Sequence, residues 1–429
     1  MPEVIIIGAG ISGLTCASTL KKLGIEAVIL EATSRPGGVI RTEKIRGFQI
    51  EWGPSSIQPA PAALKLIDEA GLWDDLLPPD PHAPRFIYLN GRLRKFPLGP
   101  FSFGGIARIL AEPFIRSKSP QDESVRDFIV RRFGVEAHDR LAGPLLGSGI
   151  YATDTRQLSV RAVLPRIVEM ERLYGSLIGA MLRSFSKKSP AVTSKARPRG
   201  FTFTFPNGNE TLPARLAESL DVRYGETSGS IGQAPVTVLA VPSYAAAGLL
   251  DEQHSALAKL LGSIRYSPVI VAAVSLNEHD LPEPLKGFGF LVPRSERLHL
   301  LGTIFSSALF PGRAPEGRVL LTSFLGGSFE PEVLTWPDDQ VWETVCSELK
   351  RVLKADAMPE PIGLRRHQHA LPQYNIGHEK LVASLKNELE RIPGLFITSN
   401  YLEGASVPAC IEQAERTAHQ IAEYVRRKS

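Results

Sequence analysis

The chain has 429 residues, enough for roughly two or three domains, and its 43% hydrophobic and 22% charged residues exclude wholesale disorder. Lysine and arginine together number 49 against 45 acidic residues, so the net charge of +4 gives no nucleic-acid footprint. Three widely separated cysteines build neither a disulfide framework nor a CxxC metal site, and no apolar stretch is long enough to span a membrane, so we expect an intracellular protein.

The first forty residues predict a complete βαβ unit. Residues 4–7 form an apolar, β-branched run that is typical of a buried parallel strand, and helical periodicity follows over residues 14–24. A second apolar strand over residues 27–30 ends at Glu31. The pattern G-x-G-x-x-G, residues 8–13, joins the first strand to the helix.

Each part of this motif has a physical role in binding a dinucleotide. Gly8 allows a tight turn, Gly10 lets the backbone approach a pyrophosphate, and Gly13 allows close packing of the helix on the sheet. Unpaired N–H groups at the helix N-terminus attract phosphate charge. Glu31 lies eighteen positions after the last glycine and can accept hydrogen bonds from ribose hydroxyls. The alternative is a glycine-rich turn that binds no ligand.

Two more loops of small residues follow. Arg35-Pro36-Gly37-Gly38-Val39 comes directly after the ribose-binding acid, and Glu51-Trp52-Gly53-Pro54-Ser55-Ser56 comes next. Both suit a chain that passes close to a bulky cofactor such as a flavin. Each taken alone is also compatible with simple turn chemistry.

Three later segments are predicted to be helical. Val125, Phe128, Ile129 and Phe133 share one helical face, which Gly134 ends. Residues 164–178 are apolar-rich with scattered arginines, and ordinary helical core is their simplest interpretation. The C-terminal pattern over residues 411–425 predicts an amphipathic helix that packs on the first domain.

The sequence shows no motif for a metal site or for nucleophilic hydrolysis. His367-x-His369 places two imidazoles on one face of a strand without a third ligand, so we expect no metal site. No G-x-S-x-G motif is present for nucleophilic hydrolysis. A cofactor would then supply the chemistry while the protein orients the substrate, and we name no catalytic side chain.

The N-terminal motifs resemble the FAD-binding half of the amine oxidase and protoporphyrinogen oxidase superfamily. Later segments resemble the oxygen-dependent protoporphyrinogen oxidases, in the right order over nearly the whole chain: residues 90–94, 151–154, 175–178, 302–307, 310–315, 324–327, 372–374, 377–378, 394–396 and 404–407.

The resemblance implies an α/β (α+β) fold: a Rossmann-type FAD-binding domain, a mixed-sheet substrate domain and a helical lobe that associates with a membrane surface. The expected divisions are residues 1–86, 200–262 and 386–429 for FAD, 94–188 for the lobe, and 87–93, 189–199 and 263–385 for substrate. The residues expected at FAD are Gly8, Ala9, Gly10, Ile11, Ser12, Gly13, Glu31, Ala32, Arg35, Gly37, Gly38, Val39, Gly53, Pro54, Ser55, Ser56, Asn400, Ala405, Ser406 and Val407.

The implied reaction is the six-electron oxidation of protoporphyrinogen IX to protoporphyrin IX, with O2 as acceptor and H2O2 as product. Arg94 matches the family position that pairs with a substrate propionate; the alternative is a solvated arginine at a strand end. Leu291 and Ile304 match positions on one face of the macrocycle, Phe324 matches the other face, and Gly149 a small residue near the substrate. Plain sheet core is the alternative for these apolar positions.

Several alternatives stay open. Coproporphyrinogen III, with four propionates, would undergo the same chemistry. An amine substrate would need an aromatic cage that Asn400-Tyr401-Leu402 does not supply, and a third possibility is a protein that binds FAD or porphyrin without turnover. The sequence leaves the oligomeric state open, a homodimer included, and the expected location is cytoplasmic, peripheral on the inner face of the cell membrane.

Two departures from the family pattern are visible. Only residues 222–235 separate a helix from the strand that ends in Val241-Pro242, so the usual hairpin is predicted to be truncated near Ser228. Ser399 stands before Asn400 where glycine is usual.

Overall fold

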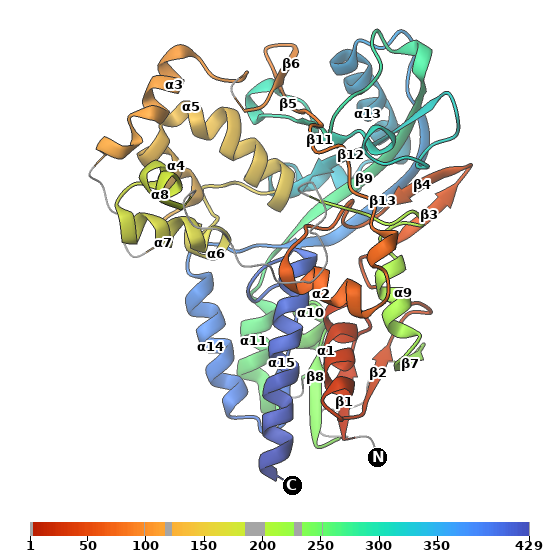
Figure 1. The fold of residues 1–429 in the computed structure, drawn as a ribbon, viewed down its shortest axis with the longest axis vertical. Helices are drawn as coiled ribbons and strands as arrows, with labels where there is room; N and C mark the ends of the chain where they lie inside the picture. The colour runs from red at the N-terminus through yellow and green to blue at the C-terminus, as the bar shows by residue number, and fades with distance from the viewer. Residues whose placement is uncertain are drawn as a thin grey trace.

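The computed structural model describes residues 3–97, 99–115, 122–184, 202–226, 234–250 and 252–428. A five-stranded sheet with its helices forms one end of the molecule, where both termini lie, and a seven-stranded sheet and a helical lobe form the other (Figure 1). A two-stranded hairpin, β3 (Thr42–Ile45) and β4 (Phe48–Glu51), lies between the two sheets.

The five-stranded sheet is parallel, with the order β14-β8-β1-β2-β7. Its strands are β1 (Val4–Ile7), β2 (Ala27–Glu31), β7 (Asp221–Tyr224), β8 (Val236–Leu239) and β14 (Leu395–Ile397). One core packs against α1 (Ile11–Lys22), α2 (Pro61–Glu69), α9 (Thr211–Ala217) and α15 (Val407–Lys428). A second core packs against α10 (Ser243–Gly248), α11 (Ser255–Gly262) and α14 (His378–Glu390). The predicted βαβ unit and C-terminal helix are both present.

The seven-stranded sheet is mixed, with the order β13-β9-β12-β11-β10-β5-β6. Its strands are β5 (Arg85–Leu89), β6 (Arg92–Lys95), β9 (Tyr266–Asn277), β10 (Gly289–Leu291), β11 (Leu300–Ile304), β12 (Arg318–Gly326) and β13 (Glu360–Pro372). Helix α13 (Asp338–Leu353) covers one face of the sheet. The short helix α12 (Ser306–Leu309) connects β11 to β12 along the chain. The other face of the sheet packs on Phe48 and Ile50 of β4 and on Trp52, which directly follows this strand. The hairpin therefore connects the seven-stranded sheet to the half of the molecule that contains the parallel sheet.

The lobe is helical around its own core. Its helices are α3 (Phe103–Leu110), α4 (Val125–Phe133), α5 (Val135–Ala137), a π-helix over His138–Tyr151, α6 (Val160–Val163), α7 (Pro165–Tyr174) and α8 (Leu177–Ser184). Val125 and Phe128 are buried and Gly134 ends α4, as the periodicity predicts. None of the described helices combines the length and the apolar character that a membrane crossing requires.

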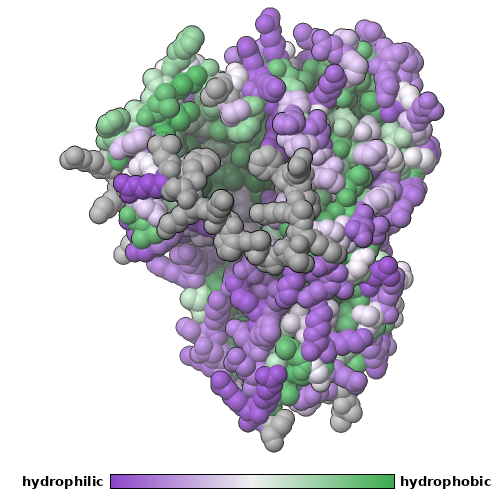
Figure 2. All heavy atoms as spheres, in the orientation of Figure 1, coloured by the Kyte–Doolittle hydropathy of each residue, from purple (hydrophilic) through white to green (hydrophobic). Residues whose placement is uncertain are grey.

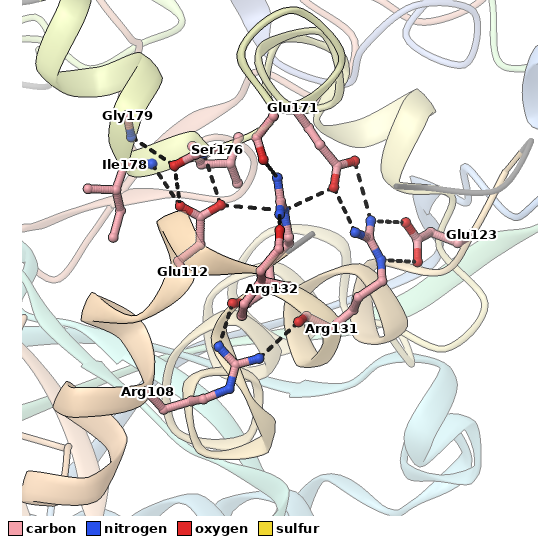
Figure 3. A network of polar contacts seen from close by, with 12 residues as sticks. Arg108, Glu112, Glu123, Arg131, Arg132, Glu171, Ser176, Ile178 and Gly179 are labelled. Atoms are coloured by element: carbon pink, nitrogen blue, oxygen red, sulfur yellow. Dashed lines mark hydrogen bonds and ion pairs between the residues drawn. The ribbon is translucent and has the colours of Figure 1, made fainter. Parts of the chain in front are cut away.

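Buried charges hold this lobe together (Figure 3). Arg132 is fully buried, with Nε 2.9 Å from Glu171 and 3.4 Å from Glu112. Its neighbour Arg131 lies 2.6 Å from Glu123 and 2.7 Å from Glu171. Because taking such charges out of water is costly, the network is stable only while each charge keeps its partners.

Glu112 extends the network to the start of α8 (Figure 3). Its carboxylate accepts hydrogen bonds from the Ser176 hydroxyl at 2.7 Å and from the Leu177 and Ile178 amides at 3.0 and 3.1 Å. These donors belong to the first turn of a helix, where amides have no acceptor within the helix. The Arg108 guanidinium donates to the carbonyls of Arg131 and Arg132, so one connected set of polar contacts joins α3, α4, α7 and α8.

The domain boundaries stay a prediction, and some expected limits fall inside elements. The limit between residues 93 and 94 lies within β6, and residue 386 lies within α14. The truncated hairpin begins with a real strand, β7, and Ser228 lies outside the described residues, as do residues 189–199.

Replacing Arg132 tests the lobe network. Arg132→Met leaves buried carboxylates without their partner, so the free energy of unfolding should fall by about 3–5 kcal/mol. Arg172→Met removes an exposed pair with Glu169 on the same lobe and should leave the free energy of unfolding nearly unchanged, because water screens this pair. Urea titrations of both variants measure the difference, and equal losses would contradict a special role for the buried network.

Candidate functional site

The turn between β1 and α1 is open to a ligand. Gly10 caps α1, no side chain accepts from the first amides of this helix, and a Cβ on Gly10 would meet nothing within 4 Å. Gly13 differs, because its Cβ would lie 2.0 Å from the Gly8 carbonyl oxygen. Gly8 has a φ of +103°, which side chains rarely adopt. The motif residues Ile11, Ser12 and Gly13 form the first turn of α1.

Glu31 ends β2 beside this turn. It is 8% exposed, and its carboxylate accepts from the Ala9 amide at 2.8 Å and from the Thr33 amide at 2.9 Å. Oε1 also accepts from the Thr33 hydroxyl at 2.7 Å, so Oε2, which accepts from Ala9, keeps the lone pair for a further donor such as a ribose hydroxyl. Ala32 follows it on the surface. Glu31 therefore both fixes the first loop and offers an acceptor.

The Gly37-Gly38 loop lies against the first one. The Gly37 amide donates to the Ala9 carbonyl at 2.8 Å, and a Cβ on Gly38 would come 3.5 Å from the Gly10 Cα. Arg35 donates to the carbonyls of Pro36, Ile40 and Gly38, and it pairs with Glu210 at 3.2 Å. Its guanidinium therefore shapes the glycine loop, while its place as a ligand to FAD stays a prediction. Val39 is 58% exposed.

The third loop, Gly53-Pro54-Ser55-Ser56, packs directly on the second. A Cβ on Gly53 would lie 2.0 Å from the Val39 carbonyl oxygen, so only glycine fits there. Asn209 donates to the Pro54 carbonyl at 2.7 Å. Ser56 lines a large cavity together with Leu291, and Ser55 a small one together with Ile304, so this loop lies next to the seven-stranded sheet.

A second helix N-terminus reaches the same region. Helices α1 and α15 pack side by side, and both begin at the carboxyl edge of the parallel sheet (Figure 1). Helix α15 begins at Val407, directly after Ala405 and Ser406. The Tyr374 hydroxyl and His378 contact the carbonyls of Asn400 and Leu402 in the preceding loop. Burial lowers the pKa of His378, so this contact is made by a neutral ring.

A cavity of about 800 Å³ lies between the third loop and the substrate sheet. Its described lining includes Ser56 and Gln58 from the loop region, Ile87 and Leu291 from the sheet, and Leu141 and Leu145 from the π-helix. Arg85 is the charged residue of the described lining, which contains no aspartate, glutamate or histidine. Its volume and apolar walls are those of a site for a sizeable organic ligand.

The sheet register puts three predicted substrate residues on one face. Leu291 and Phe324 flank Gly302 in one row, and Ile304 lies in the next row on the same side. Leu291 lines the large cavity and Ile304 the small one, while Phe324 is packed with the interdomain core. Gly149 lies against Leu291, since a Cβ there would come 2.9 Å from the leucine Cδ2.

The arginine that lines the cavity is Arg85. Its guanidinium carbon lies 5.0 Å from the centre of the Phe288 ring, and burial lowers its pKa from the usual value. Arg94 lies opposite Ile87 on β6, so it is on the same side of the hairpin, but it is not among the lining residues. The Nε of Arg94 is buried without a hydrogen-bond partner in the described structure. The contact of Arg94 with a substrate propionate stays a prediction. Arg85, which lines the cavity, was not predicted from the sequence.

The position of Arg85 could have been predicted from the sequence. The turn Asn90-Gly91 predicts a hairpin. Alternation along its strands would have placed Arg85, Ile87 and Arg94 on one face.

The histidine pair on β13 has other partners. His369 packs on Tyr244, with ring centres 4.4 Å apart, and burial lowers the pKa of His367 beside Trp52. No group of three or more potential metal ligands occurs among the residues that the structure describes.

The donor set fits FAD. Two helix N-termini and a glycine cradle suit a pyrophosphate, Glu31 suits a ribose, and a backbone loop of small residues suits the approach of a flavin ring. The large cavity begins at that loop, so a substrate bound there would lie next to the ring.

The chain resembles known proteins over its full length. Residues 11–422 match the family described as flavin containing amine oxidoreductase. Protoporphyrinogen oxidase 1 of Spinacia oleracea chloroplasts is 35% identical over 99% of this chain and 84% of its own, and coproporphyrinogen III oxidase of Bacillus subtilis (strain 168) is 28% identical over 99% and 98%. Among solved structures, a provisionally named protoporphyrinogen oxidase of Exiguobacterium sp. 255-15 covers 98% of both chains with a TM-score of 0.81 at 23% identity.

Gly10→Val tests the cofactor cradle. Because the space in front of Gly10 is open, the valine should fit the protein alone yet occupy the position of the pyrophosphate, so the variant should fold and retain no FAD. Gly248→Ala is the control, since a Cβ there also meets nothing within 4 Å but lies away from the site. Flavin absorbance and thermal unfolding of both variants measure the outcome, and stoichiometric FAD in Gly10→Val would contradict the assignment.

Proposed function

The chain belongs to the flavin containing amine oxidoreductase family, on the branch of the protoporphyrinogen oxidases, so it is an FAD-dependent oxidoreductase, and we propose that its substrate is protoporphyrinogen IX. The product is then protoporphyrin IX, formed by loss of six electrons. The names of its relatives support a role in porphyrin biosynthesis.

One observation carries the proposal: the cavity next to the third cofactor loop combines apolar walls with a guanidinium and no acid in its described lining. Protoporphyrinogen IX is a large apolar macrocycle with both of its propionates on one side. Leu291 and the π-helix side chains would contact the macrocycle, while Arg85 would bind a propionate. A guanidinium suits this contact because its planar fork matches a carboxylate.

Binding then determines the orientation of the substrate. A propionate at Arg85 would fix one side of the macrocycle in a cavity that Ser56 of the third loop also lines. Bound FAD would supply the two-electron redox chemistry, and we propose O2 as the final acceptor with H2O2 as product. The residues of this chain hold the reacting carbon in place and keep the cavity walls apolar.

Coproporphyrinogen III is the second candidate. Arg92 and Arg94 lie on the Arg85 side of the hairpin, opposite Leu89 and Ile87, and these cations favour a substrate with more carboxylates. The similarity to the Bacillus subtilis enzyme also supports it.

We also propose a peripheral membrane contact through the lobe. Apolar side chains gather on this part of the surface (Figure 2), where Phe103 is 94% exposed, Phe114 85% and Leu110 65%. Exposed apolar surface of this kind suits an interfacial helix. A homodimer is the further assembly that we propose.

Arg85→Ala should raise KM and leave the flavin content intact. A carboxylate contact is made similarly in the ground state and the transition state, so kcat should change little. Loss of a largely desolvated pair should cost about 2–5 kcal/mol. Arg85→Lys should recover only part of this loss.

Arg94→Ala and Arg92→Ala complete the series. An effect of Arg94→Ala equal to that of Arg85→Ala would show that both arginines bind the substrate. Steady-state kinetics on protoporphyrinogen IX measure all variants, and an unchanged KM for Arg85→Ala would contradict the anchor.

Phe103→Ser/Phe114→Ser tests the membrane contact. Binding to phosphatidylcholine–phosphatidylglycerol vesicles should fall about tenfold or more, because two exposed aromatic rings no longer insert. Met358→Ser/Ile376→Ser removes two apolar side chains that are each 51% exposed outside the lobe and should leave binding unchanged. Equal vesicle binding by all three proteins would rule out this surface.

The proposed function itself is tested with the purified holoenzyme. It should be yellow, convert protoporphyrinogen IX into a red-fluorescent porphyrin and release H2O2. A protein that cannot be loaded with FAD, or a loaded protein that forms no porphyrin from either porphyrinogen, would refute the proposal.

A further inference from the structure

A buried ion pair joins the two halves of the molecule near the cofactor loops. Glu51 ends β4 and is 7% exposed, while Arg313, from the loop after α12, is 2% exposed. Their charged groups lie 2.7 Å apart. The Arg313 carbonyl also accepts from the Gln49 amide at 3.0 Å, so backbone and side chain of the substrate half both hold the hairpin.

Polar contacts connect this pair to the third cofactor loop. Arg313 donates to the Thr204 hydroxyl at 2.6 Å, which donates to the Asn209 side-chain oxygen at 2.9 Å. The Asn209 backbone amide donates to Glu51 at 3.1 Å. The Asn209 side-chain amide then donates to the Pro54 carbonyl at 2.7 Å, so the position of Pro54 depends on groups that Arg313 and Glu51 hold.

A second branch leads to the glycine loop. The Thr42 hydroxyl donates to the free oxygen of Glu51 at 2.8 Å and accepts from the Glu210 amide at 3.2 Å. Glu210 pairs with Arg35, which donates to the Gly38 carbonyl at 2.7 Å. Both loops expected at the flavin are thus connected to one buried pair.

Arg313 has no room to touch a ligand itself. The cavity beside it, lined also by Glu51, Ser55 and Ile304, has a volume of only about 10 Å³, which is that of one water molecule. Any effect of Arg313 on the cofactor must therefore pass through Glu51, Thr204 and Asn209.

We propose that Arg313 is a positioning residue for FAD, which reaches the cofactor from the substrate half of the chain through Glu51 and Asn209 and fixes the Gly37-Gly38 and Gly53–Ser56 loops. This proposal rests on the FAD site described above. It predicts that a substitution in the substrate half, outside the cofactor site, weakens FAD binding.

The charge of Glu51 gives the proposal a pH signature. Burial raises the pKa of Glu51, while Arg313 lowers it; Arg313 is the charged group in contact, and Glu210 and Arg35 lie beyond Thr42. Without Arg313 the pKa of Glu51 rises further, so the variant keeps this buried carboxyl protonated, and its deprotonation at higher pH leaves an unpaired charge inside the network. FAD affinity in such a variant should therefore fall as the pH rises through this pKa.

The experiment measures the dissociation constant of FAD by flavin fluorescence, on apoprotein prepared from the full chain, between about pH 6 and 9. Arg313→Met should weaken FAD binding about tenfold or more, with a greater loss at high pH. Arg313→Lys should restore part of the affinity, and Arg313→Met/Glu51→Gln should remove the pH dependence. Asn209→Ala changes no charge and should weaken binding several-fold at every pH.

Arg132→Met is the matched control, because it removes an equally buried arginine from the lobe network (Figure 3) and should lower stability without changing FAD affinity. Wild-type affinity in both Arg313→Met and Asn209→Ala, or a loss of affinity that is the same in Arg132→Met, would overturn the proposal. If Arg313→Met does not fold, Asn209→Ala decides. A wild-type protein that binds no FAD would instead refute the cofactor site and the proposed function.

Discussion

The contact between Glu51 and Arg313 is the joint on which the rest of the structure depends. Two charges are withdrawn from water at the meeting point of the parallel sheet, the β3–β4 hairpin and the mixed sheet. Such burial costs several kcal/mol per ion and is offset only by close geometry and further hydrogen bonds, which Thr42, Thr204 and Asn209 provide. The pair therefore joins the β3–β4 hairpin to the loop after α12, and through Thr204 and Asn209 to the Gly53–Ser56 loop.

Different parts of the chain around the Glu51–Arg313 pair suit different parts of the ligands. Backbone amides at two helix N-termini and a glycine cradle suit a diphosphate, because they present partial positive charge without side chains. The β5–β6 hairpin brings the Arg85 guanidinium into the described lining of the cavity, with Arg94 on the same side of the hairpin. The lobe supplies apolar wall residues from its π-helix and is held rigid by its own buried charges.

Local patterns were enough to predict the βαβ unit and the C-terminal helix, because each is encoded in consecutive residues, while the FAD contacts of the three loops stay a prediction. The positions of Glu51, Asn209 and Arg313 could not be predicted, since their contacts join residues far apart in the chain. Arg132 lies on the same helical face as Val125 and Phe128, yet its charge partners Glu112 and Glu171 are far from it in the chain, so its buried pairing could not be predicted. Arg85 was missed because its role depends on the register of the β5–β6 hairpin.

We propose that this protein, with FAD bound, oxidises a porphyrinogen that carries two propionates. The most direct measurement compares kcat/KM of the holoenzyme for protoporphyrinogen IX and coproporphyrinogen III under identical conditions. The account predicts a higher value for protoporphyrinogen IX. A higher value for coproporphyrinogen III would contradict the substrate assignment, and no turnover of either would contradict the proposed chemistry.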